Sequence, residues 1–177
     1  GSWSNDIRLT TDSQFDQRPS IAQTKDGRVW IVWSSNRNNR QMDLFFRTYD
    51  GTTWSNDTIL FNDSDTSCQQ FYPLGCDDTG ADIVQDRDGS IRVFWSRFLP
   101  VQSIGLLGEI FTIESTDNGL TFSTVNQQRL TSNDESDIGP AVFSFKDTRL
   151  RVFWTRPSSG LPGVVDILYM KSDPVFT

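Results

Sequence analysis

Hydrophobic and polar residues alternate along this chain in short blocks, and no block has the spacing of a long amphipathic helix. Runs of β-branched and aromatic residues are bounded by turn pairs such as Asp-Gly, which is typical of β-strands that leave hairpin turns. One pattern of nine residues occurs three times, at 26–34, 88–96 and 147–155. Each copy ends in a tryptophan followed by a hydroxyl residue, so the sequence predicts a chain built from internal repeats.

The repeats extend on both sides of this pattern. An aspartate lies eleven residues before the turn glycine or its equivalent, and an aromatic residue followed by a hydroxyl residue, such as Trp54-Ser55, recurs near the end of each unit. Four strands joined by turns form an antiparallel meander. We expect strands over 3–11, 19–24, 29–35, 42–48 and 54–61, then 81–85, 91–97, 109–115 and 122–130, then 140–145, 150–156 and 166–171.

The strand at 29–35 is apolar on both faces. Val29, Ile31 and Trp33 alternate with Trp30 and Val32 along it. A strand of this kind must be covered on both sides. Sheets stacked face to face around an axis supply that cover, so the sequence predicts an all-β fold of β-propeller blades, with three four-stranded antiparallel meanders in the chain.

Composition excludes several classes of protein. The formal net charge of −7 argues against nucleic acid or an anionic membrane as a partner, because both require a basic surface. No apolar run approaches the roughly 20 residues that span a bilayer, so we expect no membrane insertion. Histidine is absent, which removes the commonest general base and any Ser-His-Asp arrangement.

Two cysteines, Cys68 and Cys76, lie close together with Pro and Gly between them. We expect a disulfide that closes a loop, since a metal site with two cysteines would lack further ligands. This pairing predicts a secreted or cell-surface protein.

The segment 115–122, Ser-Thr-Asp-Asn-Gly-Leu-Thr-Phe, resembles the Asp-box, or BNR repeat, of the sialidase superfamily. A version one residue shorter occupies 48–54, and a degenerate one occupies 172–176. All three lie between the third and fourth predicted strands of a unit, as in that family. The aspartate and glycine suit a tight turn. The residues expected to build these turns are Thr48, Asp50, Gly51, Trp54, Ser115, Asp117, Gly119 and Phe122.

The resemblance implies a six-bladed propeller, whereas the chain has three predicted units. Residues 1–2 look like a cloning scar, 3–11 a strand that completes another blade, 12–61 the first blade, 62–130 the second, and 131–177 a third without its fourth strand. Three blades are fewer than the roughly four to eight that close a propeller. We therefore expect a head-to-tail homodimer of six blades, the competing interpretation being a fragment of a longer propeller.

One end of the predicted meanders gathers repeated charges. Carboxylates beside guanidiniums could bind a polar ligand, such as a sugar or a carboxylate. Alternatively, each aspartate caps backbone N–H groups and each arginine pairs with an acidic residue at the start of the third strand, namely Asp43, Glu109 or Asp166. The candidate binding residues are Asp16, Asp78, Asp137, Arg37, Arg97 and Arg156, of which Arg37 is the looser equivalent.

The resemblance also implies a sialidase site, with three arginines on the substrate carboxylate, a tyrosine nucleophile and an aspartate acid/base. This chain has Arg18-Pro19 where the family has Arg-Ile-Pro, and Tyr49, Tyr72 and Tyr169 do not match the nucleophile. No catalytic residue and no cofactor is therefore assigned. The acidic segments 62–65 and 77–78 could hold calcium, but EF-hand spacing is absent.

Two functions remain open. The first is a non-catalytic propeller module that self-assembles into a closed ring and binds a polar ligand, a glycan or a protein. The second is a fragment or half of a sialidase-like glycoside hydrolase. A cluster of apolar residues in the predicted loop between the second and third strands of the second unit is expected to form a contact surface. Its members are Phe98, Leu99, Val101, Ile104, Leu106 and Leu107.

Overall fold

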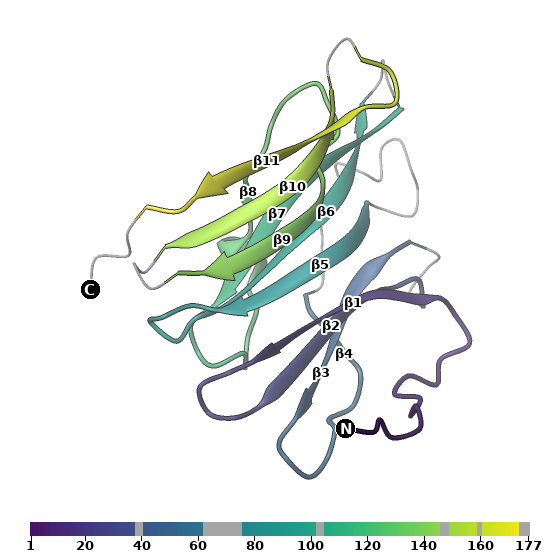
Figure 1. The fold of residues 1–177 in the computed structure, drawn as a ribbon, viewed down its shortest axis with the longest axis vertical. Coiled ribbons are helices and arrows are strands. Elements are labelled where there is room, and N and C mark those ends of the chain that lie inside the picture. The colour runs from purple at the N-terminus through teal and green to yellow at the C-terminus, as the bar shows by residue number, and fades with distance from the viewer. Residues whose placement is uncertain (38–40, 62–75, 102–104, 146–148, 159–160, 174–177) are drawn as a thin grey trace.

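The computed structural model describes residues 1–37, 41–61, 76–101, 105–145, 149–158 and 161–173. These residues form three antiparallel sheets (Figure 1). Sheet 1 has the strand order β1-β2-β3-β4, sheet 2 the order β5-β6-β7-β8, and sheet 3 the order β11-β10-β9. Among the described residues, no helix is long and apolar enough to cross a membrane.

The strand bounds follow the repeat. Sheet 1 contains β1 (Asp16–Gln23), β2 (Val29–Ser35), β3 (Asp43–Tyr49) and β4 (Thr58–Ile59). Sheet 2 contains β5 (Asp77–Gln85), β6 (Ile91–Val101), β7 (Gly105–Ser115) and β8 (Gln128–Arg129), with the 3-10 turn η1 (Thr124–Asn126) before β8. Sheet 3 contains β9 (Ile138–Ser144), β10 (Leu150–Pro157) and β11 (Val165–Lys171).

The turn between β1 and β2 shows why these short runs form hairpins. The backbone N–H of Gly27 donates to the carbonyl of Thr24 at 2.8 Å, and that of Thr24 donates to the carbonyl of Arg28 at 2.9 Å. Gly27 has a φ of 87°, a left-handed conformation that glycine adopts without steric cost. The Asp-Gly signal in the sequence therefore marks the turn correctly.

Two cores lie between the three sheets, and β2 is covered on both faces as its sequence predicts. Val32 and Trp33, which point to opposite faces of β2, are 0% and 3% exposed. One core cluster contains Trp30, Val32 and Leu44 of sheet 1 together with Ile83 and Val93 of sheet 2. A second contains Phe94 and Ile110 of sheet 2 with three apolar residues of sheet 3, Leu150, Val152 and Trp154.

Neighbouring sheets meet at two contacts, one between sheets 1 and 2 and one between sheets 2 and 3, which we call joints. Both joints contain the same pair of hydrogen bonds. At the joint of sheets 1 and 2, the N–H of Gly80 donates to Ser34 Oγ at 3.2 Å and that of Asp78 donates to the Met42 carbonyl at 2.8 Å. At the joint of sheets 2 and 3, the N–H of Gly139 donates to Ser96 Oγ at 2.9 Å and that of Asp137 donates to the Gly108 carbonyl at 2.8 Å. The internal repeat therefore sets the contact between sheets as well as the sheets themselves.

Several predicted elements differ from the structure. Residues 3–11 form no strand, and Trp3 is 99% exposed. The strands predicted over 54–61 and 122–130 shrink to the two-residue β4 and β8, because their polar residues make few ladder contacts.

The apolar loop predicted between the second and third strands of sheet 2 is instead an extension of the β6 and β7 hairpin. Leu99 pairs with Leu107 and Pro100 pairs with Leu106. Leu107 is 6% exposed and Leu99 packs against the first core, whereas Leu106 is 43% exposed. Most of this cluster therefore lies over its own sheet, since burial on the hairpin removes its apolar area from water. Ile104 lies outside the described residues.

Candidate binding face

The repeated aspartate, tryptophan and arginine of sheet 2 form one buried triad. Trp95 Nε1 donates to Asp78 Oδ1 at 2.7 Å. Arg97 binds the same carboxylate with two atoms, Nε to Oδ1 at 2.8 Å and Nη2 to Oδ2 at 2.7 Å. Asp78 is 3% exposed and Arg97 is 1% exposed. A guanidinium and a carboxylate buried together in this two-point geometry satisfy most of each other's hydrogen-bonding groups.

Sheet 3 repeats this triad. Trp154 Nε1 donates to Asp137 Oδ1 at 2.7 Å, and Arg156 donates to the same carboxylate through Nε at 2.6 Å and Nη2 at 2.7 Å. Burial opposes ionisation of Asp137, but the hydrogen bonds from Arg156, Asn133 and Trp154 outweigh it and lower the pKa of Asp137. The hydrogen bond to Asp137 raises the pKa of Arg156.

Sheet 1 has a looser version. Trp33 Nε1 donates to Asp16 Oδ1 at 3.0 Å, but Ser35 occupies the position of the arginine. Arg37 reaches back instead, with Nη2 at 2.7 Å from Asp16 Oδ1 and Nη1 bonded to Asp57. Burial raises the pKa of Asp16, yet the hydrogen bonds from Arg37 and Ser35 give a net lowering.

The structure thus brings the six candidate residues together in pairs within each sheet and not in one cluster. Each arginine binds the aspartate of its own repeat, whereas the alternative derived from the sequence paired Arg97 and Arg156 with Glu109 and Asp166. Glu109 accepts from Arg129 Nη2 at 2.7 Å. The role of the six residues toward a ligand remains a prediction.

The two turns with the Asp-box pattern are closed by their aspartates. Asp117 Oδ1 accepts from Ser115 Oγ at 2.6 Å and from the N–H of Thr121 at 3.0 Å, and Asp117 Oδ2 accepts from Thr121 Oγ1 at 2.6 Å. These hydrogen bonds from Ser115 and Thr121 lower the pKa of Asp117 to about 2. Gly119, at φ 80°, takes the left-handed position.

The shorter turn is closed in the same way. The N–H groups of Thr52 and Thr53 both donate to Asp50 Oδ1 at 2.8 Å, and these bonds lower the pKa of Asp50. Gly51 has a φ of 101°, and Trp54 pairs with Tyr49 in an isolated bridge. A carboxylate that accepts several N–H groups holds the turn without help from other elements.

Arg18 stands apart from the other arginines at this end of the sheets. It lies in the irregularity of β1 between Gln17 and Ser20, with a φ of 54°. The equivalent positions of sheets 2 and 3 are Gly80 and Gly139, with φ values of 65° and 68°. A residue with a Cβ in this region costs roughly 1 kcal/mol or more. Sheet 1 therefore carries a side chain where the other two sheets carry none.

The guanidinium of Arg18 has no hydrogen-bond or ion-pair partner among the described residues. Its side chain lies beside the neighbouring sheet, so that a Cβ at Gly80 would be 3.4 Å from Arg18 Nη1. Arg18 is exposed. An exposed and unpaired guanidinium is available to bind a carboxylate or another oxyanion with two parallel hydrogen bonds.

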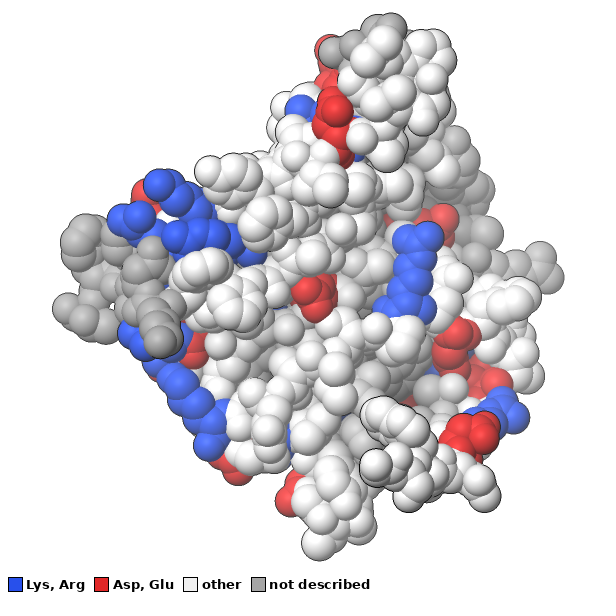
Figure 2. Space-filling model, viewed as in Figure 1, with Lys and Arg blue, Asp and Glu red and all other residues white. Residues whose placement is uncertain are grey.

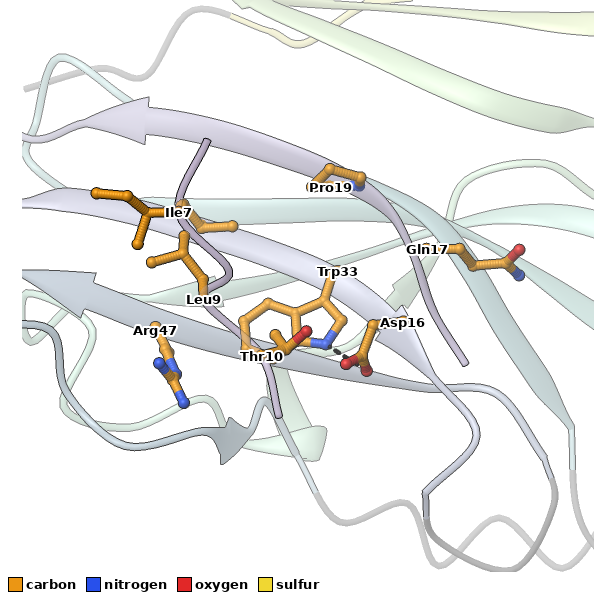
Figure 3. A pocket seen from close by; sticks show the side chains of 9 residues that line it. Ile7, Leu9, Thr10, Asp16, Gln17, Pro19, Trp33 and Arg47 are labelled. Atoms are coloured by element: carbon orange, nitrogen blue, oxygen red, sulfur yellow. Dashed lines mark hydrogen bonds between the residues drawn. The ribbon is translucent and has the colours of Figure 1, made fainter. Parts of the chain in front are cut away.

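A cavity of about 340 Å³ lies on the outer face of sheet 1, lined in part by Gln17 and Pro19, the two chain neighbours of Arg18 (Figure 3). The segment that carries Ile7, Leu9 and Thr10 crosses this face in front of Trp33 (Figure 3). The other lining residues are Asp16, Gln17, Pro19, Ile31 and Arg47. The walls are mostly apolar, with Asp16 and Arg47 as the charged groups.

The remaining candidates are a disulfide and a metal site. Cys76 is disulfide-bonded, and Cys68, the other cysteine of the sequence, lies outside the described residues. The acidic segment 62–65 also lies outside them. Asp77 Oδ1 accepts from the N–H of Met42 at 2.9 Å. Within the described part of the chain, no group of three or more acidic or cysteine side chains is placed to hold a metal ion.

On the face shown in Figure 2, charged side chains lie mostly toward the margins and the centre is largely uncharged. Basic and acidic groups are interspersed there, which agrees with the many ion pairs within and between strands. Among the residues that are coloured or white in Figure 2, basic groups form no broad patch of the kind that binds a polyanion.

Sequence reasoning identified the repeated aspartates and arginines but missed that they bind each other. The signal was present, because each aspartate precedes its tryptophan by 17 residues in all three sheets. The special backbone of Arg18 could also have been found, since aligning the repeats places it against Gly80 and Gly139.

No protein-family model matches the sequence, and a search of curated proteins gave no match. Solved structures do resemble the fold. A protein of unknown function from Dyadobacter fermentans DSM 18053 aligns with a TM-score of 0.67 at 13% identity, over 92% of this chain and 52% of that protein. The Hadza microbial sialidase Hz136 aligns with a TM-score of 0.67 at 14% identity, over 89% and 35%. An α-L-arabinanase from Penicillium chrysogenum aligns with a TM-score of 0.65 at 12% identity, over 90% and 46%.

These likenesses show the fold, which is that of a sialidase-like β-propeller. The chain spans about half, or less, of the length of each of these three proteins. Two of them are named as a sialidase and an α-L-arabinanase.

Proposed function

We propose that this chain is a non-catalytic β-propeller module that binds a polar ligand, a glycan or a protein, through an acidic group of that ligand. One observation carries the proposal: Arg18, whose guanidinium has no partner in the described part of the chain, has a left-handed backbone at a position that is glycine in the other two sheets. A costly conformation at an exposed charged residue is typical of a site kept for binding.

The charged triads support a module without catalysis. Asp78 and Asp137 are buried and bonded to tryptophan and arginine, and a general acid or base needs access to the proton that it transfers. Asp16 is engaged by Trp33 and Arg37. The triads thus serve to hold each sheet together at the end where the ligand would bind.

The proposal has further parts. The turns at Asp50 and Asp117 are Asp-boxes, which is supported by the hydrogen bonds that close them. The bonded Cys76 supports a secreted or cell-surface location. A second copy of the chain closes the ring, because three sheets are fewer than close a propeller.

Binding to a microarray of glycans with and without carboxylates tests the proposal. We expect binding to acidic glycans that is lost in Arg18→Gly. The glycine variant should be as stable as the wild type or more stable by about 1 kcal/mol, because it relieves the backbone strain. Arg18→Lys keeps the charge but not the two-point geometry and should bind more weakly. Arg8→Ala is the control, since Arg8 bonds only to nearby carbonyl groups of its own segment.

The alternative is that the chain is part of a sialidase-like glycoside hydrolase. It is favoured by the names of similar structures, which include a sialidase and an α-L-arabinanase. Turnover of fluorogenic sialosides and arabinofuranosides separates the two functions. Hydrolysis that disappears in Arg18→Gly would support the enzyme, whereas ligand binding without hydrolysis would support the module.

A further inference from the structure

Sheet 3 presents an uncovered apolar face on the side away from sheet 2. Phe153 of β10 stacks on Tyr169 of β11 with ring centroids 5.7 Å apart, and Ile167 lies two residues along β11. Phe153 is 38% exposed, Tyr169 63% and Ile167 79%. Phe143 of β9 adds a further ring that is 58% exposed. This surface is larger than single scattered apolar residues would give.

The same positions are buried in the other two sheets. By strand register, Phe153 corresponds to Val32 of sheet 1 and Phe94 of sheet 2. In the same way, Ile167 corresponds to Leu44 of sheet 1 and Ile110 of sheet 2. Val32 and Leu44 are 0% and 2% exposed under sheet 2, and Phe94 and Ile110 are 3% and 0% exposed under sheet 3. In each case the cover is the next sheet of the repeat.

The hydrogen-bond acceptors of the two joints are repeated on sheet 3 as well. Thr155 Oγ1 takes the place of Ser34 Oγ and Ser96 Oγ, and the carbonyl of Val165 takes the place of those of Met42 and Gly108. Both lie at the outer side of sheet 3, and Val165 is 63% exposed. The surface is thus shaped to accept backbone N–H groups as well as apolar side chains.

Sheet 1 carries the complementary half. Ile21 is 65% exposed on its outer face, whereas its equivalent in sheet 2, Ile83, is 5% exposed because sheet 1 covers it. The equivalents of the joint donors Asp78 and Gly80 are Asp16 and Arg18. One chain therefore carries the acceptors of a further joint on sheet 3 and the donors of such a joint on sheet 1, at opposite sides of the molecule.

We propose that a second copy of this chain docks head to tail, with sheet 3 of each copy packed on the outer face of sheet 1 of the other. This inference deepens the proposed ring and rests on it. The Phe153 and Ile167 side chains would cover Ile21 of the partner, and the two new joints would repeat the two internal ones. The six sheets of the two copies would then surround one propeller axis. The segment 3–11 would leave the face of sheet 1 and lie beside β11 of the partner, as predicted from the sequence.

Sedimentation velocity and light scattering at micromolar concentration test the contact. We expect a species of twice the 20.2 kDa chain mass. Ile167→Asp should weaken dimerisation by at least about 100-fold, because it buries a charge at the new joint. Since Ile167 is exposed within one chain, the variant should keep the circular dichroism spectrum of the wild type. Val125→Asp is the matched control, because Val125 is 89% exposed on η1 and lies on neither surface.

The head-to-tail arrangement is tested by mixing variants. Ile21→Asp and Ile167→Asp should each be monomeric, and an equimolar mixture should form dimers held by one unaltered joint. If sheet 3 packed on sheet 3 instead, Ile21→Asp alone would remain dimeric, which would overturn the proposal. A monomeric wild type, a larger open assembly, or a dimer unaffected by Ile167→Asp would also overturn it. Ligand binding by Ile167→Asp distinguishes failure of the dimer from failure of the proposed binding function. A monomeric variant that still binds acidic glycans would show that binding does not depend on the dimer.

Discussion

Gly119 lies so close to Trp30 that a Cβ at position 119 would be 2.2 Å from Cη2 and 2.4 Å from Cζ2 of the indole ring. The turn between β7 and β8 thus presses on the buried tryptophan of the neighbouring sheet, which is 1% exposed. Phe122, three residues later, meets the same indole edge to face at 6.3 Å between ring centroids. A turn that closes one sheet is therefore also part of the core between two sheets.

Gly119→Ala should destabilise the protein by about 3 to 5 kcal/mol, because it combines a left-handed backbone with a steric clash against a packed ring. Gly51→Ala is the control. Gly51 has a similar backbone at φ 101°, but a Cβ there would meet no atom within 4 Å, so the cost should be about 1 to 2 kcal/mol. Urea unfolding measures both. Equal losses in the two variants would mean that the indole contact has no effect.

Arg97→Ala should lower the free energy of unfolding by about 3 to 5 kcal/mol, because it leaves the buried Asp78 carboxylate without its charged partner. Arg28→Ala breaks the more exposed pair with Asp26, at 2.7 Å, and a hydrogen bond to the Asn118 carbonyl at 3.2 Å, and should cost about 1 to 2 kcal/mol. The comparison uses chemical denaturation near neutral pH. A loss at Arg97 no larger than that at Arg28 would contradict a structural role for the triad.

Acid should unfold the protein partly through Asp137. Its pKa is lowered in the folded state, because the hydrogen bonds from Arg156, Asn133 and Trp154 outweigh the opposing effect of burial. The stability that it contributes is fully present above the unfolded carboxyl pKa of about 3.9 and is lost as the pH falls through the folded value. Asp137→Asn should be less stable at about pH 6 and should lose less stability than the wild type between about pH 5 and pH 2. Parallel pH profiles would contradict this.

Asp82 links all three sheets. Its Oδ1 accepts from Ser20 Oγ of β1, and its Oδ2 accepts from the N–H of Val142 of β9 at 2.7 Å. Asp82→Ala should cost about 1 to 3 kcal/mol, since it leaves a backbone donor between sheets unpaired. Ser20→Ala removes only one of the two bonds and should cost about 1 kcal/mol. Thermal unfolding followed by tryptophan fluorescence checks the order of the two losses.

Much of the fold follows from local patterns in the sequence. The strand at 29–35 is predicted at its observed bounds, because a turn with glycine precedes its apolar run and a polar segment follows it. The repeat extended this prediction to β6 and β10. Positions 54–61 and 122–130 were harder, since an aromatic residue at the start of each suggested a longer strand than the polar residues after it can form.

The candidate site was only partly predictable. Repetition pointed to Asp78 and Arg97 but could not tell whether their charges meet a ligand or each other, because that depends on the strand register that brings positions 78 and 97 opposite one another. The segment 3–11 is predicted as a strand because Trp3-Ser4 matches the aromatic and hydroxyl pair that recurs along the chain, yet a strand needs a neighbour with free backbone groups. Within a single chain, the segment instead lies across the face of sheet 1.

The two joints between sheets have a consequence for how such a chain can change over evolution. Because the two observed joints use the same donors and acceptors, with Gly80 and Gly139 on one side and Ser34 and Ser96 on the other, sheets 2 and 3 each dock on the preceding sheet in the same way. Duplication or loss of one unit of coding sequence would then leave every remaining joint intact. In the proposed ring, the number of sheets would then depend on two quantities, the number of repeats in one chain and the number of chains that assemble.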